Sequence, residues 1–451
     1  MDEFKKVSEF ICGLTLEDVP ARVVEAAKLC VLDCLGAGIG AAFYEEIPTV
    51  VENVLKYSCF DPEYPVAVWG HRKNTALKDG VFLNAMMAHA LELDDVHPMS
   101  KTHIGTVVVP AAFGVSQARR ATGKRFLEAV IAGYEVMARV GMGFGVKSHR
   151  LRGWHVTGTA GTFGAAAACA KLFGLSEGQT SDALGMAGTQ SSGLWAFLQS
   201  GASCKKLHPA RAAQNGVTAA LMALSGMTGP RNVLTAPDGG LYPATSDEYD
   251  VTKLDERLGE RYELLYMDKK PYPCCRSTHC AIDAALELTE KQGLCKDEIR
   301  KIDIHTYEIG VIQCGSEKYP LKPVEAKFST PFAVASAIAC GRVGTREFEP
   351  ERIADPALKK LFQKISVFSS DDFTKRYPEM WGCRMDVAME DGRVFSKTVD
   401  DASGSVHRPM SEIQVRDKFK TLTVPVIGEE ASESVAALVS ELQNREVLCG
   451  I

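Results

Sequence analysis

The sequence predicts a mainly α-helical fold in which a large helical domain is joined to a smaller α+β module. Apolar residues recur at three- and four-residue spacing through most of residues 8–265, patterns typical of strands begin after that point, and residues 411–444 return to the helical pattern. The chain has 451 residues. This length exceeds the size at which one hydrophobic core usually stops growing, so two domains are expected.

The individual elements follow from the same patterns in chain order. Apolar spacing predicts helices over residues 21–35, 47–56, 81–93, 123–140 and 180–198. Later, alternation predicts a strand over 301–309 and a hairpin over 384–399 that turns at an Asp-Gly pair, with helices over 278–291 and 331–340. Residues 400–405 have the composition of a linker. The predicted domains are residues 1–265 with 405–451, which are helical, and residues 266–404, the α+β module.

Two features of the early helices bear on packing. Asp33 lies in an apolar helical segment and needs a polar partner if that helix is buried. Gly36, Gly38 and Gly40 have the spacing of a dinucleotide-binding loop, but a helical pattern precedes them, which argues against a nucleotide site. Small residues recur at three-residue spacing within residues 153–168. We interpret this stripe as a device for close helix packing.

The composition narrows the class of protein. The formal net charge is -6 and Lys and Arg are not concentrated into long runs, which argues against a nucleic-acid partner. No signal peptide and no apolar run of the roughly 20 residues that span a bilayer is evident, so no membrane partner and a cytoplasmic location are expected. The 14 cysteines include no Cys-x-x-Cys pair, so neither a structural zinc site nor a disulfide framework is indicated.

One stretch concentrates titratable groups. If the helix over 81–93 continues past Asp95, then His89, Glu92 and Val96 share one face, and Pro98 should end the helix near His97. A solvent-exposed helix end is the alternative, since charge runs usually face solvent. A metal-dependent hydrolase is a further alternative, although the spacing of its ligands matches no established site; the ligands would be His89, Asp94, Asp95, His97 and His103.

Three later segments also carry candidate groups. His155 precedes a helix for which Thr157 and Thr159 are candidate N-caps, and a helix N-terminus favours a carboxylate ligand. The cluster with Lys205, Lys206, His208 and Arg211 is either a solvated helix cap or an anion site. At the domain boundary, Ser277 or Thr278 should cap a helix that begins near His279. The same boundary presents Lys270, Arg276 and Cys275, the last either a nucleophile of lowered pKa or a buried, inert thiol.

Several of these stretches together resemble the family of 2-methylcitrate dehydratase and cis-aconitate decarboxylase, often called MmgE/PrpD. The resemblance implies a large helical domain built from both termini, a smaller α+β lid, a homodimer, a cleft between the domains, and no metal or organic cofactor. It runs in order over nearly the whole chain. The motifs that carry it are Val31-Leu-Asp-Cys-Leu-Gly, His89-Ala-Leu-Glu-Leu-Asp-Asp, Gly153-Trp-His-Val-Thr-Gly-Thr, Cys204-Lys-Lys-Leu-His, Lys270-Pro-Tyr-Pro-Cys-Cys-Arg-Ser-Thr-His and Glu325-Ala-Lys-Phe-Ser.

The resemblance also implies which residues form the site, and four of them depart from the family pattern. Glu92 stands where Asp is usual, Val96 and Phe332 replace the Thr and Tyr of the decarboxylase, and Cys275 replaces its second-domain His. These departures put cis-aconitate decarboxylation in doubt, and the segments 97–103 and 272–279 look more like the branch with iminodisuccinate epimerase. The implied site residues are Glu92, Val96, His103, His155, Lys205, Lys270, Cys275 and Phe332.

These groups predict chemistry that begins with proton removal beside a carboxylate of a small di- or tricarboxylate: dehydration, epimerisation or decarboxylation. We expect Lys205 and Lys270 to bind carboxylates, with a lysine or His103 as the base and His155 as the proton donor. Either Glu92 orients His103, or Asp94 and Asp95 fix the loop by capping and hydrogen bonding. Asp94, Arg276 and His279 complete the predicted substrate-binding set. The alternatives are a cis-aconitate-type decarboxylase, a non-catalytic carboxylate-binding protein, and the metal-dependent hydrolase.

Overall fold

A computed structural model describes residues 2–60 and 62–447, which form two compact units. Within these residues, unit 1 comprises the chain up to Ala196, Cys204–Asp268 and the residues from Ser411 onward, and unit 2 comprises Phe197–Ser203 and Lys269–Met410. Helices predominate in both units, and the described strands form two small sheets. The predicted mainly α-helical class is therefore confirmed.

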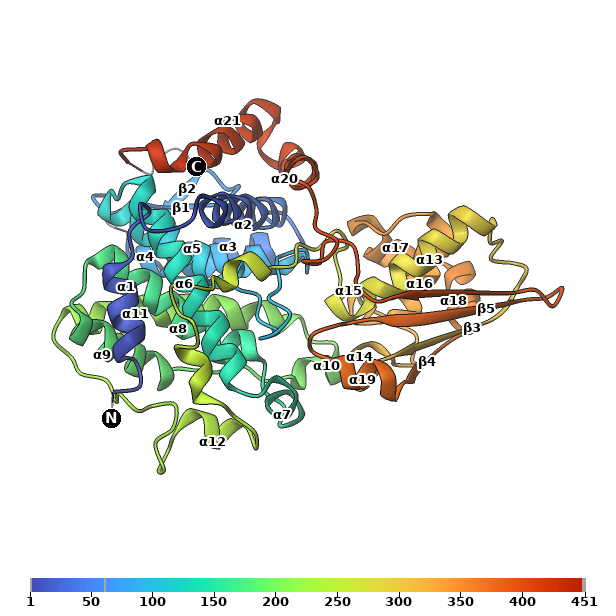
Figure 1. Cartoon of the computed structure of the whole chain (residues 1–451). Coiled ribbons are helices and arrows are strands. Elements are labelled where there is room, and N and C mark those ends of the chain that lie inside the picture. Colours follow the sequence, from blue (N-terminus) through green and yellow to red (C-terminus); the bar gives the residue numbers. More distant parts are fainter. Residues whose placement is uncertain (1, 61, 448–451) are drawn as a thin grey trace. The chain divides into compact units, whose positions relative to one another are not determined.

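Among the described residues of unit 1, helices predominate and the strands form one short hairpin, which the sequence patterns did not predict (Figure 1). Its helices are joined by turns and short 3₁₀ segments. The elements are α1 (Lys5–Gly13), α2 (Ala21–Gly40), α3 (Ile47–Tyr57), β1 (Val66–Val68), β2 (Lys73–Thr75), α4 (Leu77–Ala90), α5 (Gly105–Arg119), α6 (Gly123–Gly143), α7 (Val146–Leu151), α8 (Val156–Phe173), α9 (Glu177–Gly188), α11 (Leu207–Leu224), α12 (Leu241–Thr245), α20 (Glu412–Ile427) and α21 (Glu429–Ser440).

Helix α8 lies at the centre of unit 1. Nearly every one of its residues is buried, and it packs against α5, α6, α9 and α11. The small-residue stripe allows this close approach. A Cβ atom at Gly161 would lie 2.9 Å from the side chain of Ala212, and one at Gly164 would lie 3.0 Å from the backbone oxygen of Gly133. The prediction that these glycines serve helix packing is confirmed.

Helix α2 is buried against the carboxyl-terminal helix α20. The Nζ atom of Lys418 in α20 lies 2.7 Å from Oδ1 of Asp33, which supplies the partner that a buried aspartate was predicted to need. Gly36, Gly38 and Gly40 lie inside α2, where added side chains would collide with neighbouring residues. The three glycines therefore serve close packing within a helix and do not form a phosphate-binding loop, in agreement with the helical pattern that argued against such a loop.

Unit 2 is built on a four-stranded sheet of order β4-β3-β5-β6. Strand β3 (Ile299–Thr306) pairs parallel with β4 (Ile365–Ser369) and antiparallel with β5 (Cys383–Met389), which forms a hairpin with β6 (Val394–Val399). The predicted strand and hairpin are confirmed. Gly392 turns the hairpin at φ +89°, a value that glycine adopts readily.

Two helices of unit 2 cover the hydrophobic side of this sheet. Helices α13 and α16 pack against the strands, and their apolar residues join those of the sheet in one core. The helices of unit 2 are α13 (His279–Gln292), α14 (Glu308–Cys314), α15 (Pro323–Lys327), α16 (Thr330–Cys340), α17 (Pro350–Ile353), α18 (Pro356–Phe362) and α19 (Asp371–Arg376), while α10 (Ala196–Ser200) begins at the last residue of the first segment of unit 1.

One helix is shorter than the sequence predicted. The helix predicted over 180–198 ends at Gly188, because Gly193 takes φ +122° and Ser191 donates its hydroxyl to the Thr159 carbonyl.

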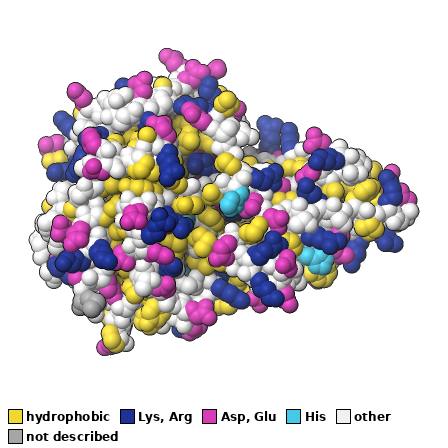
Figure 2. Space-filling model, in the orientation of Figure 1, with side chains coloured by type: hydrophobic (Ala, Val, Ile, Leu, Met, Phe, Trp, Pro, Cys, Tyr) yellow, Lys and Arg dark blue, Asp and Glu magenta, His cyan; other side chains and the backbone are white. Residues whose placement is uncertain are grey.

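None of the helices in the described part of the chain combines the length and hydropathy needed to cross a bilayer. On the face shown in Figure 2, basic and acidic side chains are interspersed.

Candidate active site

The segment after α4 does not continue the helix as predicted. Helix α4 ends at Ala90, and Glu92 takes the left-handed conformation with φ +57°. The chain must turn because Asp95 accepts hydrogen bonds from the backbone N–H of Gly105, at the start of α5, and from the hydroxyl of Tyr134. A continuous helix could not place the Asp95 carboxylate at that distant helix end. The predicted shared face of a helix through Asp95 is therefore wrong.

Asp94 holds two histidines. Its Oδ2 atom lies 2.6 Å from Nδ1 of His103 and 3.0 Å from Nδ1 of His89. Asp94 and His89 are buried, and the side chain of His103 is 12% exposed. An ionised carboxylate in this position fixes the ring orientation of both imidazoles and turns each Nε2 atom away from it. The carboxylate found at His103 is thus Asp94, where Glu92 was predicted, and this placement favours an orienting role for Asp94.

Glu92 instead pairs with Lys205. The Nζ atom of Lys205, in a 3₁₀ turn (Ser203–Lys206), lies 2.5 Å from Oε1 of Glu92, and both side chains are buried. The same oxygen lies 3.7 Å from Nε2 of His89, so His89 stands between two carboxylates. Lys206, by contrast, pairs with Glu45 and Glu46. The site therefore contains a buried ion pair beside the histidines, and the burial of its two charges carries a desolvation cost.

His155 lies near the two histidines that Asp94 holds, at the N-cap of α8. Its ring centroid lies 6.3 Å from that of His103 and 6.4 Å from that of His89. The prediction that Thr157 or Thr159 caps the helix is wrong, because both lie inside it. The Thr157 hydroxyl instead accepts a hydrogen bond from the backbone N–H of His103.

His155 also contacts His208, in the first turn of α11. The two Nδ1 atoms are 2.9 Å apart. Burial, followed by the charges of His208, Lys205, His103 and His89, holds the pKa of His155 well below its usual value. Burial and Lys205 lower the pKa of His208 to about 4. Sequence reasoning placed His208 only in a basic cluster; its three-residue spacing from Lys205 was the available signal.

The remaining predicted residue of this loop, Val96, does not present a functional group. It is buried, and its backbone pairs with that of Asp268 in an antiparallel bridge. The following His97 is also buried, with Nδ1 2.8 Å from the Ser100 hydroxyl and Nε2 3.2 Å from a carboxylate oxygen of Glu263. Asp95, engaged as described above, is buried beside Asp33, and burial above all raises its pKa to about 7.

These contacts bear on the metal-dependent alternative. Of the five proposed ligands, His89, Asp94 and His103 have ligand atoms within 4.8 Å of one another, whereas Asp95 and His97 are engaged elsewhere. The three clustered residues can contact a metal ion, but the carboxylate-imidazole contacts described above account for the same arrangement. Metal analysis of the purified protein separates the two arrangements.

Five predicted residues lie in unit 2. Lys270 is fully buried. The backbone N–H of Cys275 donates to the Lys327 carbonyl, and Sγ of Cys275 lies 3.9 Å from the amide nitrogen of Gln313. Cys275 is therefore a buried thiol just before a 3₁₀ turn, which Arg276 begins. The other two are His279, whose ring packs edge-on against Tyr272, and Phe332, which belongs to the hydrophobic core beside Tyr319 and Phe348.

The predicted cap of α13 is wrong in detail. The helix begins at His279 as predicted, but its N-cap residue Thr278 makes no capping hydrogen bond with its side chain. The Thr278 hydroxyl instead donates to the carbonyl of Cys275 and lies 3.0 Å from Sγ of Cys274. Thr278 therefore stabilises the turn before the helix.

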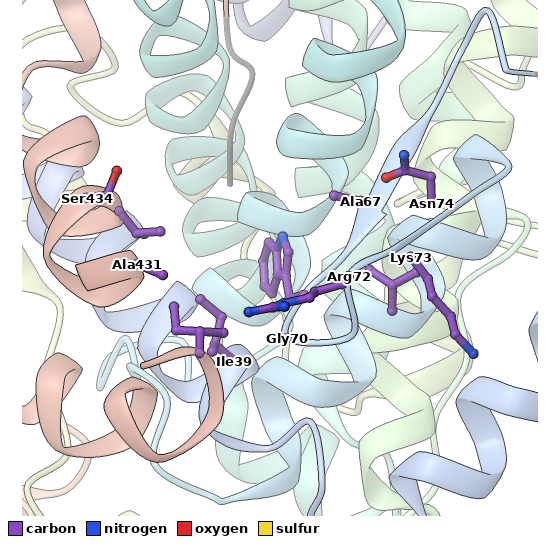
Figure 3. Close-up of a pocket in the computed structure, with 12 residues that line it drawn as sticks. Ile39, Ala67, Gly70, Arg72, Lys73, Asn74, Ala431 and Ser434 are labelled. Atoms are coloured by element: carbon purple, nitrogen blue, oxygen red, sulfur yellow. The ribbon is translucent and has the colours of Figure 1, made fainter. Parts of the chain in front are cut away.

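A pocket of about 400 Å³ in unit 1 contains none of the predicted site residues. It lies between the β1–β2 hairpin and α21, and Figure 3 shows Ala431 and Ser434 on one side and Ala67 and Asn74 on the other. Arg72 and Lys73 also line it. The pocket therefore lacks the acid-base groups that gather around Asp94.

Comparison with known proteins gives matches along most of the chain. Residues 5–253 match the MmgE/PrpD N-terminal domain, and residues 272–444 match the MmgE/PrpD C-terminal domain. The chain is 25% identical to a cis-aconitate decarboxylase of Aspergillus terreus, over 97% of this chain and 92% of that protein. It is 26% identical to the human cis-aconitate decarboxylase, over 97% and 91%. It is 28% identical to the 2-methylcitrate dehydratase of Escherichia coli K12, over 46% and 45%.

Proposed function

The chain belongs to the MmgE/PrpD family, and on this premise we propose that it is a lyase that removes a proton beside a carboxylate of a small di- or tricarboxylate, without a metal ion. The observation that carries the proposal is the cluster formed by the partly exposed, Asp94-bound His103, the buried His155 and the buried Lys205–Glu92 pair. This group combines a base, an acid and a cation, which such a reaction requires.

His103 is the base in this proposal. Its Nδ1 atom lies against Asp94, so that the neutral ring presents Nε2 as a proton acceptor. The negative charge of Asp94 stabilises the imidazolium that forms when His103 takes the proton from carbon. The partial exposure of His103, in contrast to the buried His89 and Asp94, is consistent with access for substrate.

Lys205 binds a substrate carboxylate and stabilises the enolate-like charge that develops after proton removal. Glu92 holds its ammonium group beside the histidines. His155 then donates a proton to the leaving hydroxyl or to the carbanion. Lys270, Cys275, Arg276, His279 and Phe332 stay predictions from the family resemblance, as do the homodimer and the cytoplasmic location.

Three types of reaction begin with this proton removal: dehydration, decarboxylation and epimerisation. Dehydration of the 2-methylcitrate type is our first candidate, since departures from the decarboxylase pattern at Glu92, Val96, Cys275 and Phe332 disfavour decarboxylation. A cis-aconitate-type decarboxylase is the second candidate, because the decarboxylases named above align with nearly the whole chain. An epimerase, or a family member that binds a carboxylate without chemistry, remains a further alternative.

A substrate panel tests the reaction. We would incubate the protein in heavy water with 2-methylcitrate, citrate, cis-aconitate and small dicarboxylates, and record deuterium uptake, water loss and carbon dioxide release. Water loss supports the dehydratase, carbon dioxide the decarboxylase, and exchange without loss an epimerase. No exchange with any bound compound would indicate a non-catalytic binder. Stoichiometric metal whose removal abolishes turnover would overturn the metal-independent mechanism.

Replacement of Lys205 tests the site itself. We expect Lys205→Ala to lower kcat/KM by about 10²–10³-fold, because the developing negative charge loses its cation. Lys270→Ala should have an effect of similar size. Lys206→Ala is the matched control, since Lys206 occupies the same 3₁₀ turn but pairs with Glu45 and Glu46. Wild-type rates for folded Lys205→Ala protein would exclude the assignment.

A further inference from the structure

The Nδ1 atom of His155 contacts a second histidine, His208. This atom lies 2.9 Å from Nδ1 of His208, a hydrogen-bonding distance for two imidazoles. Only one proton can lie between the two atoms, so one ring must donate and the other accept. The contact therefore couples the tautomers of the two rings.

The surroundings hold this pair in place. The backbone N–H of His155 donates to the Gly193 carbonyl, and the ring of Trp195 packs edge-on against His155 with centroids 5.2 Å apart. The rings of His155 and His208 have centroids 5.1 Å apart. His155 is buried, whereas His208 is partly exposed. His155 is thus fixed between an aromatic ring and His208.

Both rings are neutral near pH 7. Burial lowers both pKa values, and the cationic or protonatable groups around the pair lower them further. A neutral imidazole carries one proton, on either Nδ1 or Nε2. The groups that face His155 are His208, Lys205, His103 and His89, and those that face His208 include Lys205 and His89.

We infer that His208 is a positioning residue whose Nδ1–H donates to Nδ1 of His155 and thereby keeps the proton of His155 on Nε2. The inference rests on the proposed function, in which His155 is the proton donor. Because His208 occupies Nδ1 of His155, only Nε2 can deliver a proton to substrate. In that step the Nε2–H bond of His155 breaks as the new bond forms at the substrate oxygen or carbon, and the electron pair stays on Nε2. The proton that His103 took from carbon then neutralises the His155 imidazolate, which returns both rings to their starting state.

Two substitutions of nearly equal shape test the inference. The amide nitrogen of Asn can occupy the place of Nδ1 of a histidine and donate, whereas Asp offers only an acceptor when ionised. We expect His208→Asn to keep kcat within about tenfold of wild type. We expect His208→Asp to lower kcat by up to about 10⁴-fold, the loss that a catalytic histidine held in the wrong tautomer can cause. KM should change little in either variant.

The pH profile and the tautomer give independent readings. The carboxylate of His208→Asp should raise the apparent pKa of His155 and thereby move the pH dependence of kcat to higher pH. His208→Asn should leave the pH dependence unchanged. Nitrogen-15 NMR of histidine-labelled protein should show Nε2–H on His155 in wild type and Nδ1–H in His208→Asp. Circular dichroism and thermal melting verify that both variants fold.

The outcomes separate the inference from the proposed function. An active His208→Asp enzyme, or NMR signals that place the proton of wild-type His155 on Nδ1, would overturn the role of His208. Equal loss of activity in both variants without a change of tautomer would also overturn it, since that result indicates a merely structural residue. If wild type acts on no carboxylate, the proposed function fails, while the NMR experiment still decides whether His208 donates to His155.

Discussion

His97 and His103 stand six residues apart in one loop, yet the fold uses them differently. Both ring nitrogens of His97 are engaged, by the Ser100 hydroxyl and the Glu263 carboxylate, and the ring is fully buried. His103 has Asp94 at one nitrogen, and its side chain is 12% exposed. A histidine with both nitrogens bound inside the protein cannot exchange protons with a ligand. The role of each imidazole ring is therefore set by its hydrogen-bond partners and not by its residue type or its position in the sequence.

The partners of His97 form a scaffold. Burial alone would raise the pKa of Glu263, but the hydrogen bond and charge of His97, together with Arg261 and Arg139, lower it. Glu263 is therefore ionised within a buried network. A network of this kind stabilises a loop when every member is satisfied, and it leaves no member available for catalysis. The group around Asp94 differs because it combines a partly exposed base with a lysine.

His103→Gln tests whether His103, unlike His97, takes part in the reaction. Loss of the proposed base should lower kcat by about 10²–10⁴-fold, the usual contribution of general acid-base catalysis. The protein should remain folded, since the ring is partly exposed and Asp94 keeps His89 as a partner. Steady-state kinetics with the substrate found in the panel measures the effect. Near-normal turnover would remove His103 from the mechanism.

His97→Gln should show the opposite behaviour. Removal of His97 takes away one hydrogen-bond partner of the buried Glu263, which keeps its ion pair with Arg261, so we expect a loss of about 1–3 kcal/mol of unfolding free energy. The turnover of the folded fraction should stay within about threefold of wild type. Urea unfolding followed by circular dichroism, together with kinetics normalised to folded protein, measures both quantities. A large loss of kcat with unchanged stability would contradict the structural role of His97.

His149 sharpens the comparison, because it is another buried histidine with both nitrogens engaged, by the Thr245 carbonyl and the Thr159 hydroxyl. Burial lowers its pKa to about 3. Since the folded-state pKa lies below the unfolded value, the stability it contributes is present above about pH 6.5 and is lost as pH falls toward 3.

From this shift we expect His149 alone to cost the wild type about 2 kcal/mol of stability between pH 7.5 and pH 5. His149→Gln should lack that part of the pH dependence, whatever its absolute stability at pH 7.5. Urea unfolding of both proteins at the two pH values measures the difference between the slopes. Parallel slopes would mean that His149 is protonated in the folded protein as easily as in the unfolded chain.

Local patterns in the sequence predicted much of the fold and the types of residue in the site. Helix α2 follows the predicted helical spacing, and β3 and the β5–β6 hairpin follow the predicted alternation, with the hairpin turning at Gly392. The failures occurred where a distant contact overrode periodicity. Helix α4 ends early because Asp95 must reach Gly105 and Tyr134, and α9 ends early where Ser191 bonds to α8. Periodicity carries no information about such contacts.

By itself, the sequence determined the helical character of the chain, the α+β module and the presence of acids, bases and cations that suit carboxylate chemistry. The tertiary structure decided which of them meet. Lys205 reaches Glu92 across 113 residues, and His208 reaches His155 across 53. It also decided that Asp94, and not Glu92, holds His103. The reason is physical: the role of a titratable group depends on its burial and its partners, and packing between distant segments sets both.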